Sequence, residues 1–158
     1  MRMLSMLVAA LVLVQPALAG PLPDAIPGWR ILRTPHDYRT LVRRVDEAVK
    51  ASPLNVVTRA SATIGAKSLG KTIPGNMVVG VYGPKFAVRM LEASIAAGIE
   101  APLRLYLTEN ADGTATLSFK LPSFVFRPYF EDGGEALERL AAELDGILAE
   151  IADRAAAP

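Results

Sequence analysis

The sequence contains no cysteine, a single histidine, His36, and a single tryptophan, Trp29, among its 158 residues. The lack of cysteine excludes disulfides, thiolate nucleophiles, covalent haem attachment and cysteine-based metal sites. It also excludes the acylated cysteine that anchors a bacterial lipoprotein. With one histidine, a metal site would need a cage of carboxylates, and no spacing of Asp or Glu indicates one. The sequence therefore predicts no metal and no other cofactor.

An excess of charge of either sign is also lacking. The chain has 17 Lys and Arg against 16 Asp and Glu, and loss of the N-terminal leader with Arg2 leaves 16 of each. A neutral chain has no overall attraction for nucleic acid or anionic lipid, so neither is a predicted partner. With 51% hydrophobic and 21% charged residues, the composition is typical of one globular domain.

No apolar run is long enough to span a membrane, which takes about 20 residues. The run from Met3 to Val14 follows Arg2 and precedes Ala17-Leu18-Ala19, the small-x-small pattern of a signal-peptidase site. Its length disfavours the alternative of an uncleaved membrane anchor. The sequence therefore predicts a signal peptide at residues 1–19, a mature protein starting at Gly20, and a periplasmic or secreted location.

The mature chain is predicted to hold a proline-rich linker (20–28), one domain (29–154) and a frayed tail (155–158). Apolar periodicity predicts the order β-α-β-β-α-β-β-α in the domain. This order predicts an α+β fold, an antiparallel sheet with three helices on one face. The predicted elements are a strand 29–33, a helix capped by Thr34 and ended by Ser52, strands 55–64 and 77–82, a helix 85–97 closed by Gly98, strands 103–109 and 114–120, an extended connection 122–129, and a last helix from Asp132.

Several short strings in this domain, taken in order, resemble the bacterial domain-of-unknown-function family 302, also called TT-1751-like. They are Asn55–Val57, Asn76–Pro84, Ala101–Leu105, Asp112-Gly113, Leu121–Ser123 and Pro128-Tyr129. The resemblance covers residues 29–151 and implies a TBP-like fold, often dimeric, without an established activity. It does not imply DNA binding, because a shared fold does not carry a function with it. The leader is a departure from the compact cytosolic members of that family.

Residues 65–72 match the phosphate-binding P-loop pattern, with Lys71 and Thr72 at its end. A phosphate site of this kind needs a helix that begins at the Lys-Thr pair, so that backbone amides point at the ligand. Pro74 and Gly75 follow too closely for such a helix. The segment is therefore predicted to be a basic loop between two strands, with no nucleotide site.

Candidate catalytic residues are few. His36 lies beside the predicted start of a helix and is interpreted as a surface residue, because no serine lies in the context of a nucleophile elbow. A glycosidase would need two acids across a cleft. The sequence does not bring together any two of the acids available for that role, which are Glu92, Glu109, Glu131 and Asp132.

One surface remains a candidate for function. If Leu103, Leu105 and Leu107 pack on the helices, then Arg104 and Tyr106 lie on the other face of the sheet. The same alternation predicts further side chains on or near that face: Arg59, Ser61, Thr116, Ser118, Tyr82 and Lys85. Three interpretations stay open, namely an ordinary half-solvated face, a self-association surface, and a site for a small anionic or aromatic ligand.

The predicted function is accordingly a non-enzymatic envelope module that binds a small ligand or a protein, with a homodimer as the expected assembly. The alternative is a small periplasmic enzyme with a Ser, Tyr and carboxylate site. No catalytic residue is assigned, and a deep cleft holding a perturbed carboxylate would favour the enzyme. The predicted ligand or interface residues are Arg59, Tyr82, Lys85, Arg104 and Tyr106.

Overall fold

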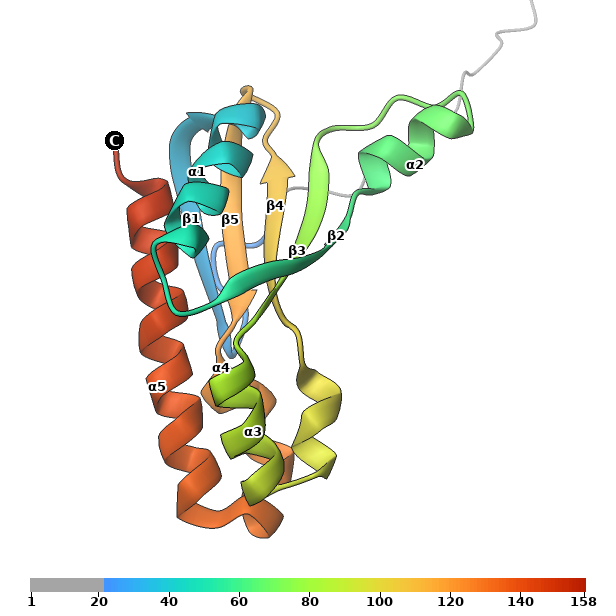
Figure 1. The fold of residues 1–158 in the computed structure, drawn as a ribbon. Helices are drawn as coiled ribbons and strands as arrows, with labels where there is room; N and C mark the ends of the chain where they lie inside the picture. The colour runs from blue at the N-terminus through green and yellow to red at the C-terminus, as the bar shows by residue number, and fades with distance from the viewer. Residues whose placement is uncertain (1–21) are drawn as a thin grey trace, which may run out of the picture.

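The structure is a computed structural model that describes residues 22–158, so the predicted signal peptide and Gly20 lie outside the described residues. Its centre is one antiparallel sheet of five strands in the order β1-β5-β4-β3-β2 (Figure 1). The strands are β1 (Trp29–Asp37), β2 (Asn55–Ala60), β3 (Asn76–Tyr82), β4 (Leu103–Glu109) and β5 (Thr114–Lys120). The helices are α1 (Tyr38–Lys50), α2 (Ala62–Ser68), α3 (Pro84–Ala93), α4 (Pro122–Val125) and α5 (Phe130–Ala156), with 3-10 turns η1 (Ala96–Glu100) and η2 (Arg127–Tyr129).

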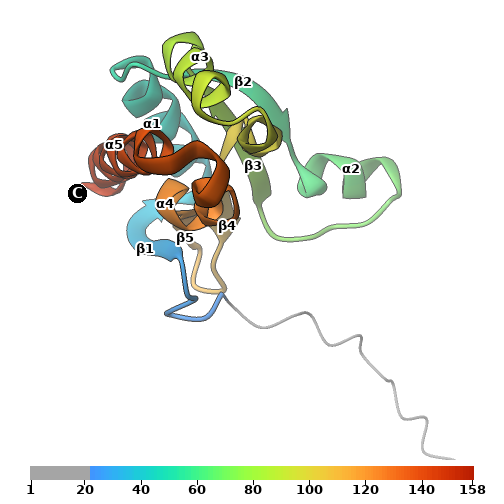
Figure 2. The same ribbon diagram turned by 90° about the horizontal axis from the view of Figure 1, so that it is seen from below.

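The predicted α+β fold is confirmed. Helices α1 and α5 cover one face of the sheet, and α3 packs against α5 at the lower end of the molecule (Figures 1 and 2). Apolar side chains from both layers meet between them and are fully buried, among them Leu41, Leu105, Leu107, Leu117, Leu140 and Leu148. Among the described residues, no helix combines the length and apolar character needed to cross a membrane.

The β4–β5 hairpin forms where it was predicted. Asn110 and Thr114 close its turn through a backbone hydrogen bond of 2.8 Å, and Gly113 adopts a φ of +83°. The Asp112 carboxylate accepts from the backbone N–H and the hydroxyl of Thr114, which holds the tip of the turn. Leu105 and Leu107 face the helices, as their alternation with Arg104 and Tyr106 predicted.

The boundary between the first strand and the first helix lies later in the chain than predicted. Strand β1 continues to Asp37 through an irregularity after Thr34, because β5 supplies backbone partners as far as Thr114. The Thr34 hydroxyl donates to the carbonyl of Ala115 and is buried. Asp37, not Thr34, therefore caps α1, since its carboxylate accepts from the backbone N–H of Thr40 at 2.9 Å.

The second predicted strand is too long by four residues. Strand β2 ends at Ala60, and the Ser61 hydroxyl accepts from the N–H of Ile64 to begin the short helix α2, which was not predicted. Lys71 and Thr72 lie in an irregular segment after α2, so no helix begins at them. The rejection of a P-loop is thereby confirmed, although the segment before Lys71 is helical.

Two connections at the lower end also differ from the prediction. Helix α3 ends at Ala93 instead of reaching Gly98, because the backbone of Ser94 turns extended. Gly98 serves close packing, since a Cβ there would lie 2.8 Å from a Leu91 methyl group. The predicted extended connection 122–129 is helical (α4 and η2) and is held to α5 by a 2.9 Å bond from the Ser123 N–H to Asp145.

The C-terminal residues, predicted to fray, are helical as far as Ala156, and Ala155 is fully buried. The Arg44 guanidinium of α1 donates to the carbonyls of Ala155, Arg154 and Ala157 at 2.8, 3.2 and 2.6 Å. The His36 ring nitrogen Nε2 also lies 2.7 Å from the Ala157 carbonyl oxygen. The last carbonyls of α5 therefore have partners within the fold, which stabilise this end of the helix.

Candidate functional site

The face of the sheet opposite α1 and α5 carries a cleft of about 660 Å³. The open face is formed by the side chains that alternate with the buried leucines, and residues of α4 and η2 join them in lining the cleft. Helix α4 lies at the lower end of the sheet (Figure 1). Charged and aromatic side chains dominate the lining, which includes Trp29, Glu100, Arg104, Tyr106, Lys120 and Phe124. A volume of this size lies within the range of small-molecule sites, roughly 300–1,000 Å³.

The strand register places four of the open-face positions in one row across the sheet. Trp29 of β1 pairs with Lys120 of β5, and Arg104 of β4 pairs with Gly80 of β3. Leu105 pairs with Phe119, so the register continued by one residue sets Arg104 opposite Lys120. The row therefore reads Trp29, Lys120, Arg104, Gly80, with the two cations on neighbouring strands.

The aromatic walls of the cleft are held by specific contacts. The Lys120 ammonium lies 5.7 Å from the centre of the Trp29 ring, within cation–π range. The Phe124 ring packs directly on Gly28, where a Cβ would lie 2.1 Å from the ring, and the φ of Gly28 is +74°. The guanidinium of Arg127 lies 5.3 Å from the centre of the Phe124 ring. Trp29 and Phe124 are thus set in place by the turn that precedes β1 and by α4.

Tyr106 occupies the next row, between Ser118 of β5 and Val78 of β3. Its hydroxyl accepts a hydrogen bond of 2.6 Å from the side-chain amide of Asn76. Ser118 and Thr116 lie on this face, as predicted, but both are buried and neither presents its hydroxyl to solvent. The polar groups that remain available on this part of the face come from Tyr106 and Asn76.

Glu100 is the one carboxylate among the cleft-lining residues of the described chain. It accepts a hydrogen bond of 2.8 Å from the Tyr129 hydroxyl, and this bond raises the pKa of Tyr129. Its other oxygen lies 4.0 Å from the guanidinium of Arg104, whose side chain is 64% exposed. Both oxygens of Glu100 therefore have partners in the protein, and the cleft keeps an excess of positive charge.

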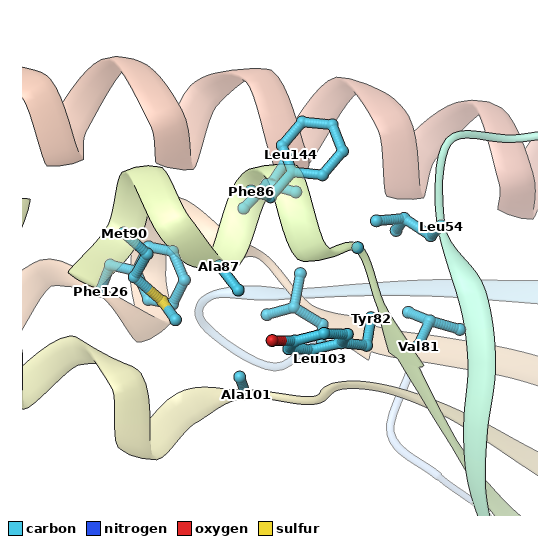
Figure 3. Close-up of a pocket in the computed structure, with 11 residues that line it drawn as sticks. Leu54, Val81, Tyr82, Phe86, Ala87, Met90, Ala101, Leu103, Phe126 and Leu144 are labelled. Carbon is cyan, nitrogen blue, oxygen red and sulfur yellow. The ribbon is translucent and has the colours of Figure 1, made fainter. Parts of the chain in front are cut away.

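Two of the five predicted site residues, Arg104 and Tyr106, line the cleft. Lys85 lies exposed in the first turn of α3 and does not line it. Tyr82 instead lines a small apolar crevice of about 30 Å³ between α3, α5 and the end of β3 (Figure 3). A space of that volume holds about one water molecule, so the crevice is no ligand site.

The prediction for Arg59 is wrong about its face. Strand β2 contains a β-bulge between Val56 and Thr58, which shifts the alternation of its side chains by one residue. Arg59 consequently pairs with Val79, whose side chain is buried under the helices, and its guanidinium forms an ion pair with Asp46 of α1. Ser61, predicted beside it, caps α2 instead.

Sequence reasoning missed Trp29, Lys120 and Phe124 as cleft residues. Trp29 and Lys120 lie at strand ends, and only the pairing of β1 with β5, distant in the chain, brings them together. Phe124 lies in the segment predicted to be extended. The one signal in the sequence was the alternation of Thr116, Ser118 and Lys120, which places Lys120 on the same face as Ser118.

The candidate catalytic acids do not meet in this cleft. The Glu109 carboxylate accepts from the backbone N–H of Gly75 at 2.6 Å, at the opposite end of β4 from Arg104. Glu92, Glu131 and Asp132 are exposed residues of α3 and α5. Within residues 22–158, no three or more His, Asp or Glu side chains are grouped so that they could hold a metal ion.

Comparisons with known proteins place the chain in a family. Residues 31–155 match the family described as "Domain of unknown function DUF302". The crystal structure of the uncharacterised conserved protein DUF302 from Bacillus stearothermophilus shares the fold, with a TM-score of 0.73 and 20% identity over 82% of this chain and 99% of that chain. A search of curated proteins found no match. The chain therefore belongs to the DUF302 family.

Proposed function

We propose that this protein is an exported, non-enzymatic module that binds a small molecule in the open-face cleft. The observation that carries the proposal is the cleft itself, a hollow of about 660 Å³ bounded by Trp29, Tyr106 and Phe124 with polar groups placed among them. A few convergent polar groups in a largely apolar hollow are typical of ligand sites. The same face carries Arg104 and Tyr106, which the sequence had marked for binding.

The enzyme alternative has less support from the cleft. Nucleophilic catalysis needs a nucleophile within hydrogen-bond reach of a base. Among the lining residues that the structure describes, the hydroxyl of Tyr106 is bonded to an amide, and the one carboxylate, Glu100, is bonded to Tyr129 and faces Arg104. This arrangement supports reversible binding better than proton transfer.

Native mass spectrometry of the protein isolated from its host envelope tests the binding function. We expect a retained small molecule in the wild type, and its loss when Arg104→Ala and Tyr106→Ala are combined, because both side chains line the cleft. Lys85→Ala, a change outside the cleft, should retain the molecule. A wild-type protein that carries no added mass and binds no compound from a metabolite extract would contradict the proposal.

The export part of the proposal rests on the leader at residues 1–19, with its apolar run and its Ala17-Leu18-Ala19 site. The intact mass of the protein from the envelope fraction should correspond to a chain that starts at Gly20. Changing Ala17 and Ala19 to bulky residues should leave the precursor uncleaved, because signal peptidase requires small residues there. Full-length protein in the cytoplasm of wild-type cells would be evidence against export.

Self-association is a second candidate, favoured by apolar side chains that the single chain leaves exposed. Helix α2 projects away from the body (Figures 1 and 2) and buries none of its residues, while Ile64 and Leu69 are 68% and 74% exposed. At the lower end, Ile95 and Ile99 of the α3–η1 segment are 82% and 77% exposed. We propose that a second copy covers these surfaces, with α2 of one chain lying on the α3–η1 end of the other.

Light scattering at tens of micromolar tests this assembly. A dimer is expected for the wild type, and Leu69→Asp and Ile95→Asp should each give monomers, since each buries a charge in the same interface. Thr72→Asp, an exposed change outside both apolar groups, is the control for added charge and should remain dimeric. A wild-type monomer would remove the second candidate and leave the cleft proposal intact.

A further inference from the structure

Two cations, Arg104 and Lys120, line the cleft, and Glu100 is the one carboxylate among its described lining residues. The β4–β5 register pairs Leu105 with Phe119, and continued by one residue it would set Arg104 opposite Lys120 at the strand ends, where like charges are unfavourable. Within residues 22–158, Lys120 forms no ion pair, and its ammonium is placed over the Trp29 ring instead. Among the described residues, Lys120 therefore has no carboxylate partner, whereas Arg104 has Glu100 at 4.0 Å.

The one acid nearby cannot neutralise both cations. Glu100 is 22% exposed, accepts from Tyr129 with one oxygen and lies 4.0 Å from Arg104 with the other. Among the described residues, no carboxylate neutralises the charge of Lys120 at the edge of the cleft. An anion between Lys120 and Arg104 would receive charge-assisted hydrogen bonds from both, and these bonds are roughly twice as strong as neutral ones.

The surroundings of this cation pair are flat and aromatic. Trp29 lies beside Lys120 in the same row, Tyr106 lies in the next row, and Phe124 forms the wall from α4. A ring system fits against such walls, because offset and edge-to-face contacts between rings are favourable. A fully hydrated inorganic ion would use the cations but leave the aromatic walls without a partner.

We infer that the ligand of the open-face cleft is an organic anion with a flat apolar ring system, its acid group held between Arg104 and Lys120. This inference rests on the proposed binding function and adds the chemical class to it. The carboxylate or sulfonate of the ligand replaces the missing carboxylate between the strands. Its ring lies against Trp29 and Phe124, and neutral or cationic analogues bind weakly because they leave Lys120 without an anionic partner.

Isothermal titration of the mature protein with three matched probes tests the inference: 2-naphthoate, 2-naphthamide and 2-naphthylmethylamine. We expect the carboxylate to bind about tenfold more tightly than the amide, and the amine to bind more weakly still. Lys120→Gln and Arg104→Gln should each weaken binding of the carboxylate about fivefold and leave binding of the amide unchanged. Lys85→Gln and Arg59→Gln are the matched controls, since both lie outside the cleft.

The unliganded variants give a second measurement. Lys120→Gln removes a cation that has no carboxylate partner among the described residues, so its thermal midpoint without ligand should stay close to that of the wild type, which separates a loss of binding from a loss of folding. Equal binding of the amide and the carboxylate, or binding of the carboxylate that both cleft variants leave unchanged, overturns the choice of an anion while the cleft proposal stands. No binding of any probe, together with no retained mass in native mass spectrometry, overturns both.

Discussion

The carboxylate of Asp37 links the end of β1 to the start of α1. It accepts from the backbone N–H and the hydroxyl of Thr40, each at 2.9 Å, and these hydrogen bonds lower its pKa. A carboxyl group whose folded pKa is depressed stabilises the fold fully above its unfolded pKa, about 4. That contribution is lost as the pH falls through the lower folded value.

Asp37→Ala should therefore lower the thermal midpoint by about 2–5 °C at pH 7, because the first turn of α1 loses its cap. The difference from the wild type should shrink as the pH is lowered from 6 to 2, where the wild-type carboxylate becomes protonated. Circular dichroism melts across this range give the comparison. Asp37→Asn is the control, since asparagine caps without titrating; a difference that stays constant with pH would contradict the assignment.

The ion pair of Arg59 with Asp46 makes a second prediction for a single residue. Both side chains are more than a third exposed, so the pair contributes little, about 0–1 kcal/mol. Arg59→Gln should change the free energy of unfolding within that range, as measured by urea denaturation. Ligand binding should not change, because Arg59 lies on the helix face. A loss of ligand binding in this variant would instead indicate that the Arg59 side chain lies on the open face of the sheet.

Helix α2 and the central strands of the sheet differ in the interactions that stabilise them. Helix α2 has seven residues, none buried, and is held by the Ser61 cap and by bonds from Lys71 and Gly70 to its last turn. A helix of this length is unstable in isolation, since about 12–15 residues are needed. Its amides should therefore exchange with deuterium faster than those of β4 and β5.

Two leucine-to-alanine substitutions, one beside α2 and one in β4, should show the same difference in stability. Leu69→Ala should change the free energy of unfolding by less than about 0.5 kcal/mol, because the side chain is 74% exposed. Leu107→Ala, the same change at a fully buried position, should cost about 2–5 kcal/mol. Urea denaturation of both variants at a concentration where the protein is monomeric makes the comparison. A large cost for Leu69→Ala under those conditions would show that α2 packs on the body.

Arg44 adds polar contacts between α1 and α5, since it donates to three carbonyls at the end of α5. Arg44→Met keeps the aliphatic stem and removes these bonds, so we expect a loss of about 1–2 kcal/mol. Arg43→Met is the matched control: among residues 22–158, Arg43 pairs only with the exposed Glu47, and its loss should cost at most about 0.5 kcal/mol. Equal effects of the two changes in urea denaturation would argue against a cap on α5.

The whole molecule has one face closed by helices and one face that is open and positively charged at the cleft. Any compound that binds only the folded state raises its stability, by about 1.4 kcal/mol at ten times Kd. We expect 2-naphthoate to raise the thermal midpoint of the wild type, and added salt to reduce this shift because it screens exposed charges. Scanning fluorimetry measures both; a shift that salt does not reduce would argue against charge recognition.

Much of the fold was predictable because it is encoded by local patterns. The alternation of Leu105 and Leu107 with Arg104 and Tyr106 assigned the two faces of β4, since successive side chains of a strand point to opposite sides. The turn before Gly113 was equally clear, because that backbone conformation favours glycine. Half of the cation pair, Arg104, was therefore found from the sequence alone.

The other half of the site was decided by tertiary structure. The register of β5 with β1 and β4 brings Lys120 beside Trp29 and onto the same face as Arg104, and Phe124 reaches the cleft because α4 folds against α5. Strand pairing also decided the orientation of Arg59, because the bulge in β2 turns its side chain to the helix face. Register between strands is set by contacts far apart in the chain, whereas the sequence shows only the period within each strand.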